Sequence, residues 1–506
     1  MSNSSISSRF AVSALVNVLR GVLSFITTII IARDFGPKEF GDYAFLLGTF
    51  VGVIGLLELG TSNAFQTFIS QKERGKMFLL SYAGWQLLQI FLALVLIGII
   101  IPETWFEKIW LGHEKKLVLL VLLAVFMQQS AWKTIVQIGE SKRLTYKVQL
   151  TNLSIAIAHL LLVTGCWIAG VLSVQLIFGL ILVEYLIFIA VASKILSIFK
   201  LHSGEFDFRS TLQEYLTYCS PLIFYSIVSF GYEFADRWLL QNYGGSIQQG
   251  VYEIGFRFGM VSLLVTMSLH NIFWKEIAEA SKNKNYERIK KIYRKASRFV
   301  FSLGVFFGGF LIPWSEEIIK LMLGPSYLES SSVFSVMLIF AAFRSLGILN
   351  GSMLLATCET KVHVKIGVIW MGFSMLGSYF ILASKNSYLP GLQLGSLGLA
   401  IKMLLFSILH ANVISWWISR SYGWKFEWMY QIIVLGGAFS CSWFSFKLVQ
   451  SMNSLITFNL FFNGLLTLLF YCGFFVAMVC WVPWILGVSR RELKDFFLKL
   501  VKLSRA

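Results

Sequence analysis

Five basic residues interrupt long apolar stretches of the sequence, where a charge at the centre of a membrane-spanning helix costs about 2.5–3.5 kcal/mol. These residues are Arg20, Lys133, Arg257, Arg344 and Lys402. Guanidinium groups match the geometry of phosphate oxygens, and a surrounding of low dielectric constant strengthens the attraction between them. The pattern therefore predicts a cavity that binds a phosphorylated anion.

The first apolar stretch presents polar side chains at helical spacing along one face. That face contains Ser13, Asn17, Arg20, Ser24 and Thr27. A comparable face in residues 215–238 contains Ser226, Ser229, Glu233 and Asp236. Such faces avoid lipid, so they either line a cavity or join neighbouring helices through small and hydroxyl side chains. We predict that Asn17 and the five basic residues contact the substrate, with helix packing as the alternative role.

Acidic residues in the apolar stretches are candidates for binding a coupling ion, H+ or Na+. The four candidates are Glu58, Glu233, Asp236 and Glu253, and a further carboxylate, Glu184, lies in another stretch. Structural ion pairing is the alternative, because intramembrane carboxylates usually pair with a cation. Glu253 and Arg257, four residues apart, have the spacing of such a pair. Lys133 has a different alternative, since its long side chain can extend to the membrane surface.

The elements that must position these residues are membrane-spanning helices. Of the 506 residues, 57% are hydrophobic and 14% are charged, whereas soluble proteins carry about 25% charged residues. About twenty apolar residues span the hydrocarbon core as a helix. Fourteen stretches qualify, at 10–32, 40–63, 77–101, 117–138, 148–170, 172–193, 215–238, 250–274, 298–314, 332–356, 363–383, 393–418, 428–446 and 457–486. We predict an all-α polytopic membrane protein with about 14 transmembrane helices.

Lysine and arginine are concentrated in the two terminal segments and in alternate loops. Because short loops rich in these residues stay in the cytoplasm, we expect both termini to be cytoplasmic. The same asymmetry accounts for the formal net charge of +17, so a nucleic-acid partner is not required. The first apolar stretch extends too far for a signal-peptide core and is expected to be retained.

Sequence patterns typical of enzymes and cofactor sites are missing. The chain contains no G-x-x-x-x-G-K-[ST], G-x-S-x-G or H-E-x-x-H pattern, and its six cysteines form no C-x-x-C pair. We therefore expect neither an enzyme nor a bound cofactor or metal. Energy for uphill transport has to come from an ion gradient, the membrane potential or the supply of substrate.

A short polar motif that fits the pattern G-x-x-x-x-G-x-Y lies at residues 36–43 and again at residues 245–252, an offset of 209 residues. Its residues are Gly36, Pro37, Gly41 and Tyr43 in the first copy and Gly245, Gly250 and Tyr252 in the second. We expect glycine to permit a sharp turn, proline to start the next helix and tyrosine to anchor at the headgroup level. The motif is therefore predicted to act as a hinge, with direct substrate contact as the alternative.

The two copies predict an internal repeat, because each joins the first and second helix of its half. The predicted parts are two six-helix lobes at 1–205 and 206–420, two further helices in 421–489, and a basic cytoplasmic tail at 490–506. A cleft between the lobes is the expected substrate site. Residues 275–298, with nine basic and three acidic residues, are expected to form an amphipathic helix on the cytoplasmic surface.

Several of these motifs resemble the O-antigen and capsule type (Wzx-like) polysaccharide flippases of the MATE-like multidrug/oligosaccharidyl-lipid/polysaccharide superfamily. The likeness is carried by A-R-x-F-G-P-x-x-F-G-x-Y at 32–43, E-L-G-T-S-N at 58–63, G-P-S-Y at 324–327 and G-S-L-G-L-A at 395–400. It runs through most of residues 1–420. The resemblance implies a two-lobed transporter with a cationic cavity, which moves oligosaccharide linked to undecaprenyl pyrophosphate to the outer leaflet by alternating access.

The resemblance places Arg20, Arg257, Arg344 and Lys402 in that cavity through their helices. We therefore expect a flippase of the bacterial cytoplasmic (inner) membrane for cell-surface polysaccharide biosynthesis, with polysaccharide polymerases as candidate partners. Whether the polymer is the O-antigen of lipopolysaccharide, a capsule or an exopolysaccharide stays open, and branches that handle peptidoglycan precursor share the helix number. The alternatives are a cation-coupled multidrug exporter, which would favour an acidic cavity, and a membrane polymerase or ligase, which would need a large external loop.

Overall fold

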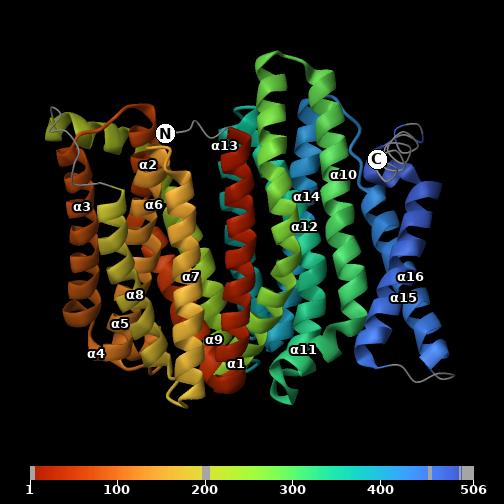
Figure 1. Ribbon diagram of the computed structural model, residues 1–506, viewed down its shortest axis with the longest axis horizontal. Coiled ribbons are helices and arrows are strands. Elements are labelled where there is room, and N and C mark those ends of the chain that lie inside the picture. Colours follow the sequence, from red (N-terminus) through yellow and green to blue (C-terminus); the bar gives the residue numbers. More distant parts are fainter. Residues whose placement is uncertain (1–5, 197–205, 454–458, 489, 491, 493–506) are drawn as a thin grey trace. The chain divides into compact units, whose positions relative to one another are not determined.

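The computed structural model describes residues 6–196, 206–453, 459–488, 490 and 492. Of the predicted tail at 490–506, only residues 490 and 492 belong to this part. The described residues form helices and contain no strand (Figure 1). The α-helices are α1 (Ile6–Glu58), α2 (Thr61–Gln71), α3 (Lys76–Val95), α4 (Glu103–Trp110), α5 (Lys115–Phe126), α6 (Trp132–Ser141), α7 (Thr145–Ile168), α8 (Val174–Ile195), α9 (Phe208–Lys282), α10 (Tyr286–Leu311), α11 (Ser315–Leu323), α12 (Ser330–Ala356), α13 (Thr360–Leu382), α14 (Gly395–Ser421), α15 (Met429–Asn453) and α16 (Leu460–Trp481). Short π-helical or 3₁₀ turns lie at Leu96–Ile100, Met127–Ala131, Ile312–Trp314, Pro325–Tyr327 and Pro483–Leu486.

Eleven helical stretches in the described part of the chain are long and apolar enough to cross a membrane. The first of them contains two of the expected spans, because α1 turns at Gly36, where φ is 68° and ψ is 176°. α9 turns in the same way at Gly245, with φ 74° and ψ 178°, and contains the spans expected at 215–238 and 250–274. Every expected stretch therefore falls on a helix, and the predicted all-α multi-pass membrane fold is confirmed.

The chain divides into two compact units. Unit 1 comprises residues 1–250 and 371–395, and unit 2 comprises residues 251–370 and 396–506. The division passes through α9 and α13, so each of these helices contributes one part to each unit. This division by contacts differs from the predicted lobe boundary at residues 205 and 206, which follows the sequence repeat instead.

The core of unit 1 forms where α1 packs on α7 and α5 packs on α8. Phe40, Phe45 and Phe50 of α1 are fully buried, as are Ile177 and Phe178 of α8. Aromatic side chains bury about 150–250 Å² each and dominate such cores. The second half of α1, which begins with the repeated motif, is therefore held firmly inside unit 1.

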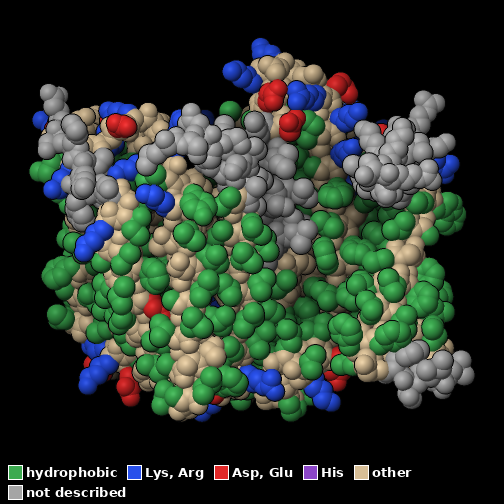
Figure 2. All heavy atoms as spheres, viewed as in Figure 1, with side chains coloured by type: hydrophobic (Ala, Val, Ile, Leu, Met, Phe, Trp, Pro, Cys, Tyr) green, Lys and Arg blue, Asp and Glu red, His purple; other side chains and the backbone are tan. Residues whose placement is uncertain are grey.

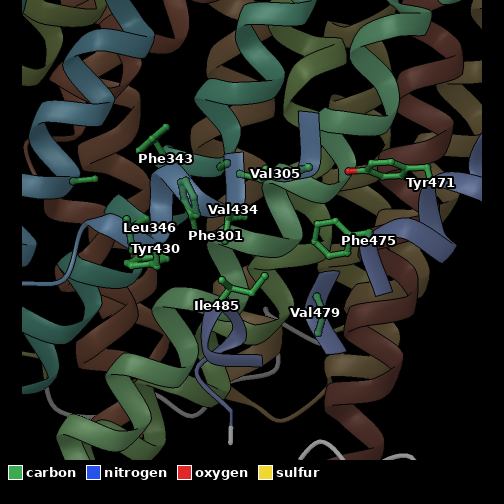
Figure 3. Packing of buried hydrophobic residues seen from close by; sticks show 13 residues of the cluster. Phe301, Val305, Phe343, Leu346, Tyr430, Val434, Tyr471, Phe475, Val479 and Ile485 are labelled. Atoms are coloured by element: carbon green, nitrogen blue, oxygen red, sulfur yellow. The ribbon is translucent and has the colours of Figure 1, made fainter. Parts of the chain in front are cut away.

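The core of unit 2 joins α10, α12, α15 and α16. Figure 3 shows Phe301 of α10 close to Val434 of α15, with Phe343 of α12 in the same buried cluster. Tyr471 of α16 is fully buried, and its hydroxyl donates a hydrogen bond to the carbonyl oxygen of Phe306 at 2.9 Å. The two C-terminal helices are thus an integral part of the core of unit 2.

Close helix crossings in unit 2 depend on glycine. A Cβ on Gly255 of α9 would lie 2.5 Å from the side chain of Val333, and a Cβ on Gly259 would lie 2.4 Å from that of Met337. Two small residues four positions apart let membrane helices approach closely. The second part of α9, which carries Arg257 between these glycines, is therefore packed tightly on α12.

Residues 275–298 do not form a separate helix on the membrane surface. α9 continues to Lys282, and α10 begins at Tyr286. Ile289 and Tyr293 are buried in a cluster with side chains of α12 and α14. The prediction of a surface helix is therefore wrong, because the apolar face of this segment packs within unit 2 rather than on lipid.

The outward side chains have the distribution expected of a membrane protein. Figure 2 shows hydrophobic side chains along the middle of the helices of each unit, with Lys, Arg, Asp and Glu gathered at the helix ends. Large apolar side chains such as Ile168 in unit 1 and Phe461 in unit 2 are exposed, at 77% and 81%. Because exposing apolar area to water costs about 25 cal/mol per Å², these surfaces fit contact with lipid.

Candidate functional site

The two copies of the repeated motif turn the chain in the same way. Gly36 and Gly245 share a positive φ and an extended ψ, a conformation that favours glycine. Pro37 follows Gly36 at the start of a helix, where its missing N–H removes no hydrogen bond. This shared geometry supports the internal repeat that we propose from the sequence.

The second glycine of each motif brings the two copies into contact within unit 1. A Cβ on Gly41 would lie 1.7 Å from the carbonyl oxygen of Ser246, and a Cβ on Gly250 would lie 2.1 Å from the carbonyl oxygen of Pro37. Each copy therefore places its second glycine against the first turn of the other. This reciprocal packing leaves no room for a side chain at either glycine.

The tyrosines of the motif are part of the protein interior. Tyr43 is 6% exposed, and its ring centroid lies 5.3 Å from that of Phe178 in unit 1. Tyr252 is also buried, with its ring centroid 5.9 Å from that of Phe256 in unit 2. The expected anchoring of these tyrosines in the headgroup layer is wrong, because both rings pack against protein.

Asp42 links the first motif copy to its surroundings in unit 1. Its carboxylate accepts hydrogen bonds from Gln241 at 3.0 Å and from the hydroxyl of Ser246. Nε2 of His113 lies 3.6 Å from the same carboxylate. Burial lowers the pKa of His113, and the Asp42 carboxylate acts in the opposite direction. The Asp42 carboxylate therefore helps to fix the turn.

Two of the predicted site residues pair with each other in unit 1. Nζ of Lys133 lies 3.0 Å from Oε2 of Glu58, and the Ser130 hydroxyl donates to Oε1 of Glu58 at 3.2 Å. Ser130 belongs to the π-helical turn Met127–Ala131, a type of turn that is frequent at functional sites. The charge of Lys133 is therefore balanced by Glu58, across two helices.

Amide side chains extend this polar cluster. Gln86 of α3 donates to Oγ1 of Thr134 at 2.9 Å, and Gln137 of α6 donates to Oγ of Ser62 at 3.1 Å. All four side chains are buried. These hydrogen bonds connect α3 to α6 and α6 to α2, so this part of unit 1 is suited to holding helices together.

Arg20 and Asn17 lie on a partly open face of α1. Asn17 is exposed and Arg20 is half-buried. Arg20 is near enough to Tyr185 of α8 to interact with it electrostatically, and Gln128 donates to the Tyr185 hydroxyl at 3.5 Å. Among the described residues of unit 1, no carboxylate forms an ion pair with Arg20. Its charge is therefore not balanced by a carboxylate of this unit.

The first part of α9 carries Glu233, which is exposed, and Asp236, which is buried. Asp236 accepts a hydrogen bond from the hydroxyl of Ser378 in α13. Sequence reasoning missed Arg237, the neighbour of Asp236, because it lies at the end of an apolar stretch. Its guanidinium packs over Gly48 of α1, where a Cβ would lie 2.0 Å from Nη1. Gly48 therefore makes room for this arginine.

Two predicted cations of unit 2 are paired or enclosed. Nε of Arg257 lies 2.7 Å from Oε1 of Glu253, which is the i,i+4 pair that the sequence suggested as an alternative. Lys402 of α14 is 0% exposed. Its Nζ lies 3.9 Å from the sulfur of Met403 and 5.8 Å from the ring centroid of Phe406. Neither cation lies open on the surface of unit 2.

Arg344 differs from the other cations of unit 2. Between Val333 and Leu354 of α12, Arg344 is exposed, and all the remaining residues are buried or half-buried. Among the described residues of unit 2, no carboxylate pairs with it. The imidazole of His410 in α14 is near enough to Arg344 to interact with it electrostatically. Arg344 is therefore an accessible positive charge near the middle of a membrane-spanning helix.

A hydrogen-bonded pair of titratable side chains in unit 1 was not predicted from the sequence. Nδ1 of His159 in α7 lies 2.9 Å from Oε2 and 3.1 Å from Oε1 of Glu184 in α8. The Glu184 side chain is only 5% exposed. The one feature of the sequence that could have indicated this contact is a histidine within an apolar stretch. A search for metal-ligand spacing does not detect a single histidine.

Comparisons with known proteins place this geometry in a known fold. The family model described as MatE matches residues 221–380. The lipid II flippase MurJ, in an inward closed conformation, matches with a TM-score of 0.71 at 16% identity, over 92% of this chain and 98% of that chain. A multidrug resistance MATE family transporter, in an inward-facing conformation, matches with a TM-score of 0.58 at 15% identity, over 79% and 95%.

A third similar structure is a MOP superfamily transporter from Pyrococcus furiosus, described as having a binding pocket of reverse polarity that suggests a different function. It matches with a TM-score of 0.54 at 13% identity, over 82% of this chain and 94% of that chain. A comparison of the sequence with curated proteins found no match. Residues 221–380 thus match the family model described as MatE, and the chain has the fold of the lipid II flippase MurJ and of MATE family transporters.

Proposed function

We propose that this protein is a flippase that moves polyprenyl-pyrophosphate-linked oligosaccharides across the bacterial cytoplasmic membrane. The observation that carries the proposal is the exposed Arg344, a charge within a membrane-spanning helix that has no described carboxylate partner in its unit. Such a charge is costly unless an anion or water meets it. A fold shared with a lipid II flippase supports this class of transporter.

The pairing of charges within each unit divides the predicted substrate-binding residues into two groups. Arg20 and Arg344 offer their guanidinium groups to the pyrophosphate, with which they can form bidentate hydrogen bonds, and Asn17 adds a polar contact beside Arg20. Lys133 pairs with a carboxylate of another helix, Arg257 pairs with a carboxylate of its own helix, and Lys402 is enclosed. We assign these three residues a structural role. The polyprenyl chain stays in lipid.

The other parts of the proposed mechanism are those predicted from the sequence. The turns at Gly36 and Gly245 are proposed as hinges of alternating access, with both termini in the cytoplasm. Coupling to H+ or Na+ is proposed to use carboxylates of the membrane-spanning helices, with Glu233 and Asp236 of α9 as candidates. Glu58 and Glu253 form ion pairs within their units. The predicted cleft between the lobes and the partnership with polysaccharide polymerases stay predictions.

The proposal is tested with the purified full chain in liposomes that contain a fluorescent polyprenyl-pyrophosphate-linked sugar. Arg344→Gln and Arg20→Gln should each slow translocation about ten- to hundredfold, since hydrogen bonds to charged groups contribute about 1.5–3 kcal/mol. Arg209→Gln, which removes an exposed arginine at the start of α9, is the matched control and should leave the rate unchanged.

Two outcomes would overturn the assignment. Full translocation rates in both Arg344→Gln and Arg20→Gln would show that these cations do not bind the substrate. Efficient transport of a cationic dye, with no translocation of the lipid-linked sugar, would identify a drug exporter of the same fold instead. Deletion of the gene provides the cellular counterpart, because a flippase defect accumulates lipid-linked oligosaccharide on the inner leaflet.

A further inference from the structure

A small basic pocket lies in unit 2, where the charged beginning of α10 meets α14 and the start of α15. Its free volume is about 40 Å³, enough for roughly three water molecules. Its lining includes the basic residues Lys290, Arg294, Arg298 and Lys425, and Glu427 is its one acidic residue. The pocket therefore suits a small anionic group that carries several oxygens.

Arg298 lines this pocket and is only 2% exposed. Its Nη1 donates to the carbonyl oxygen of Trp484 at 2.6 Å, and its Nη2 donates to Glu427. The guanidinium carbon lies 4.3 Å from the ring centroid of Trp484 and 5.6 Å from that of Tyr430. The side chain is thus fixed on three sides, and it joins α10 to α15 and to the turn after α16.

One hydrogen-bond donor of this arginine is left over. Nε of Arg298 is buried and has no partner among the described residues. A buried N–H without an acceptor is unfavourable, and buried polar groups are normally satisfied. An oxygen atom bound in the pocket would satisfy this group.

The local charge also favours an anion. Glu427 accepts hydrogen bonds from both Arg294 and Arg298, so one carboxylate serves two guanidinium groups. Lys290 and Lys425 form no ion pair with any described residue. Positive charge therefore remains uncompensated at the mouth of the pocket.

The pocket lies where the chain changes from charged to apolar. On α10 the charged residues end at Arg298, and the apolar run 299–311 follows. α15 starts at Met429, two residues after Glu427. The ring of Trp424 lies 6.1 Å from that of Tyr293, and such aromatic side chains are typical of the membrane interface. The pocket is therefore at the depth of lipid headgroups.

We propose that this pocket binds the phosphate group of an anionic phospholipid. Lys290, Lys425 and Nε of Arg298 donate to the phosphate oxygens, while Trp424 contacts the glycerol region. Basic pockets between membrane helices recognise such headgroups. The bound lipid stabilises the contact of α10 with the two C-terminal helices, and this role does not depend on the transported substrate.

The test uses the purified full chain in detergent, titrated with dioctanoyl phosphatidylglycerol, dioctanoyl phosphatidylcholine and inorganic phosphate. Binding is followed by native mass spectrometry and by the melting temperature. Phosphatidylglycerol should bind and raise the melting temperature, and the other two should bind at least about tenfold more weakly. The double variant Lys290→Gln, Lys425→Gln should weaken phosphatidylglycerol binding about twenty-five-fold, given about a fivefold effect per lysine.

The double variant Lys291→Gln, Lys361→Gln is the matched control, because it removes two exposed lysines of unit 2 that do not line the pocket. It should bind phosphatidylglycerol like the original chain. Equal binding in both double variants would overturn the pocket as a lipid site. Inorganic phosphate binding as tightly as phosphatidylglycerol would overturn the membrane lipid as the source of the ligand, with a soluble phosphate taking its place.

Discussion

The charges within the membrane-spanning helices are arranged differently in the two units. In unit 1, Lys133 pairs with Glu58 and His159 pairs with Glu184, and each pair joins two helices. In unit 2, Glu253 and Arg257 pair within one helix, whereas Arg344 stays exposed with no described carboxylate partner in the unit. Lys133 and His159 therefore link helices in unit 1, whereas Arg344 of unit 2 is an accessible charge.

An intramembrane charge is therefore not by itself a sign of a binding site. A cation that faces a carboxylate of a neighbouring helix has a structural explanation, whereas a cation without one needs an external partner. Arg20 belongs with Arg344 in this respect, although it lies in unit 1. The comparison predicts that mutations separate stability from transport according to the pairing of the charge.

The largest effect on stability is expected from the pair between α7 and α8. His159→Ala leaves the carboxylate of Glu184, which is 5% exposed, without its partner. Leaving a buried hydrogen-bond acceptor without its partner costs about 1–3 kcal/mol, and more for a charged group. We expect a loss of about 3 kcal/mol because the acceptor is a carboxylate. The measurement is the free energy of unfolding of the purified chain in mixed micelles.

A second variant separates the lost pair from lost packing. His159→Ala combined with Glu184→Ala removes both partners, so no carboxylate is left buried and most of the stability should return. If His159→Ala is as stable as the original chain, the pair does not link the two helices. A double variant that is less stable than His159→Ala would show that packing, and not charge, dominates at this position.

A smaller effect is expected for Glu58 and Lys133, because the Lys133 side chain is 42% exposed. Solvent screens such a pair, and exposed pairs contribute about 0.2–1 kcal/mol. A double-mutant cycle with Glu58→Gln and Lys133→Gln should therefore give a coupling energy near 1 kcal/mol. A coupling energy of zero would mean that Lys133 does not interact with Glu58 and is available to bind the substrate.

Much of the fold could be predicted from the sequence, because apolar stretches of sufficient length have few other structures available to them. The turns at Gly36 and Gly245 could also be predicted from the sequence, since the repeated motif occurs at both. The surface helix at 275–298 was predicted wrongly. The charged face of this segment suggested contact with solvent, and the apolar face suggested contact with lipid. In the structure the apolar face packs on protein instead.

The pairing of the candidate site residues could not be predicted to the same extent. Glu58 and Lys133 are 75 residues apart, and their contact depends on how α1 and α6 pack. The pair of Glu253 and Arg257 was foreseen because both residues lie on one helix. Arg298 was counted only as one charge of a basic segment, since its burial follows from α15 and the turn after α16.

The smallest effect on stability is expected at Arg344, the charge that defines the contrast between the units. Arg344→Gln removes an exposed side chain that has no described carboxylate partner in unit 2, and substitutions at such positions usually change stability by less than about 0.5 kcal/mol. The unfolding measurement used for His159→Ala therefore serves here as well. A loss above about 1 kcal/mol would mean that Arg344 holds the helices together, as the pairs of unit 1 do. An unchanged stability together with slow translocation would leave ligand binding as the reason for an arginine at this depth, because a position without structural demands would otherwise accept an apolar residue at lower cost.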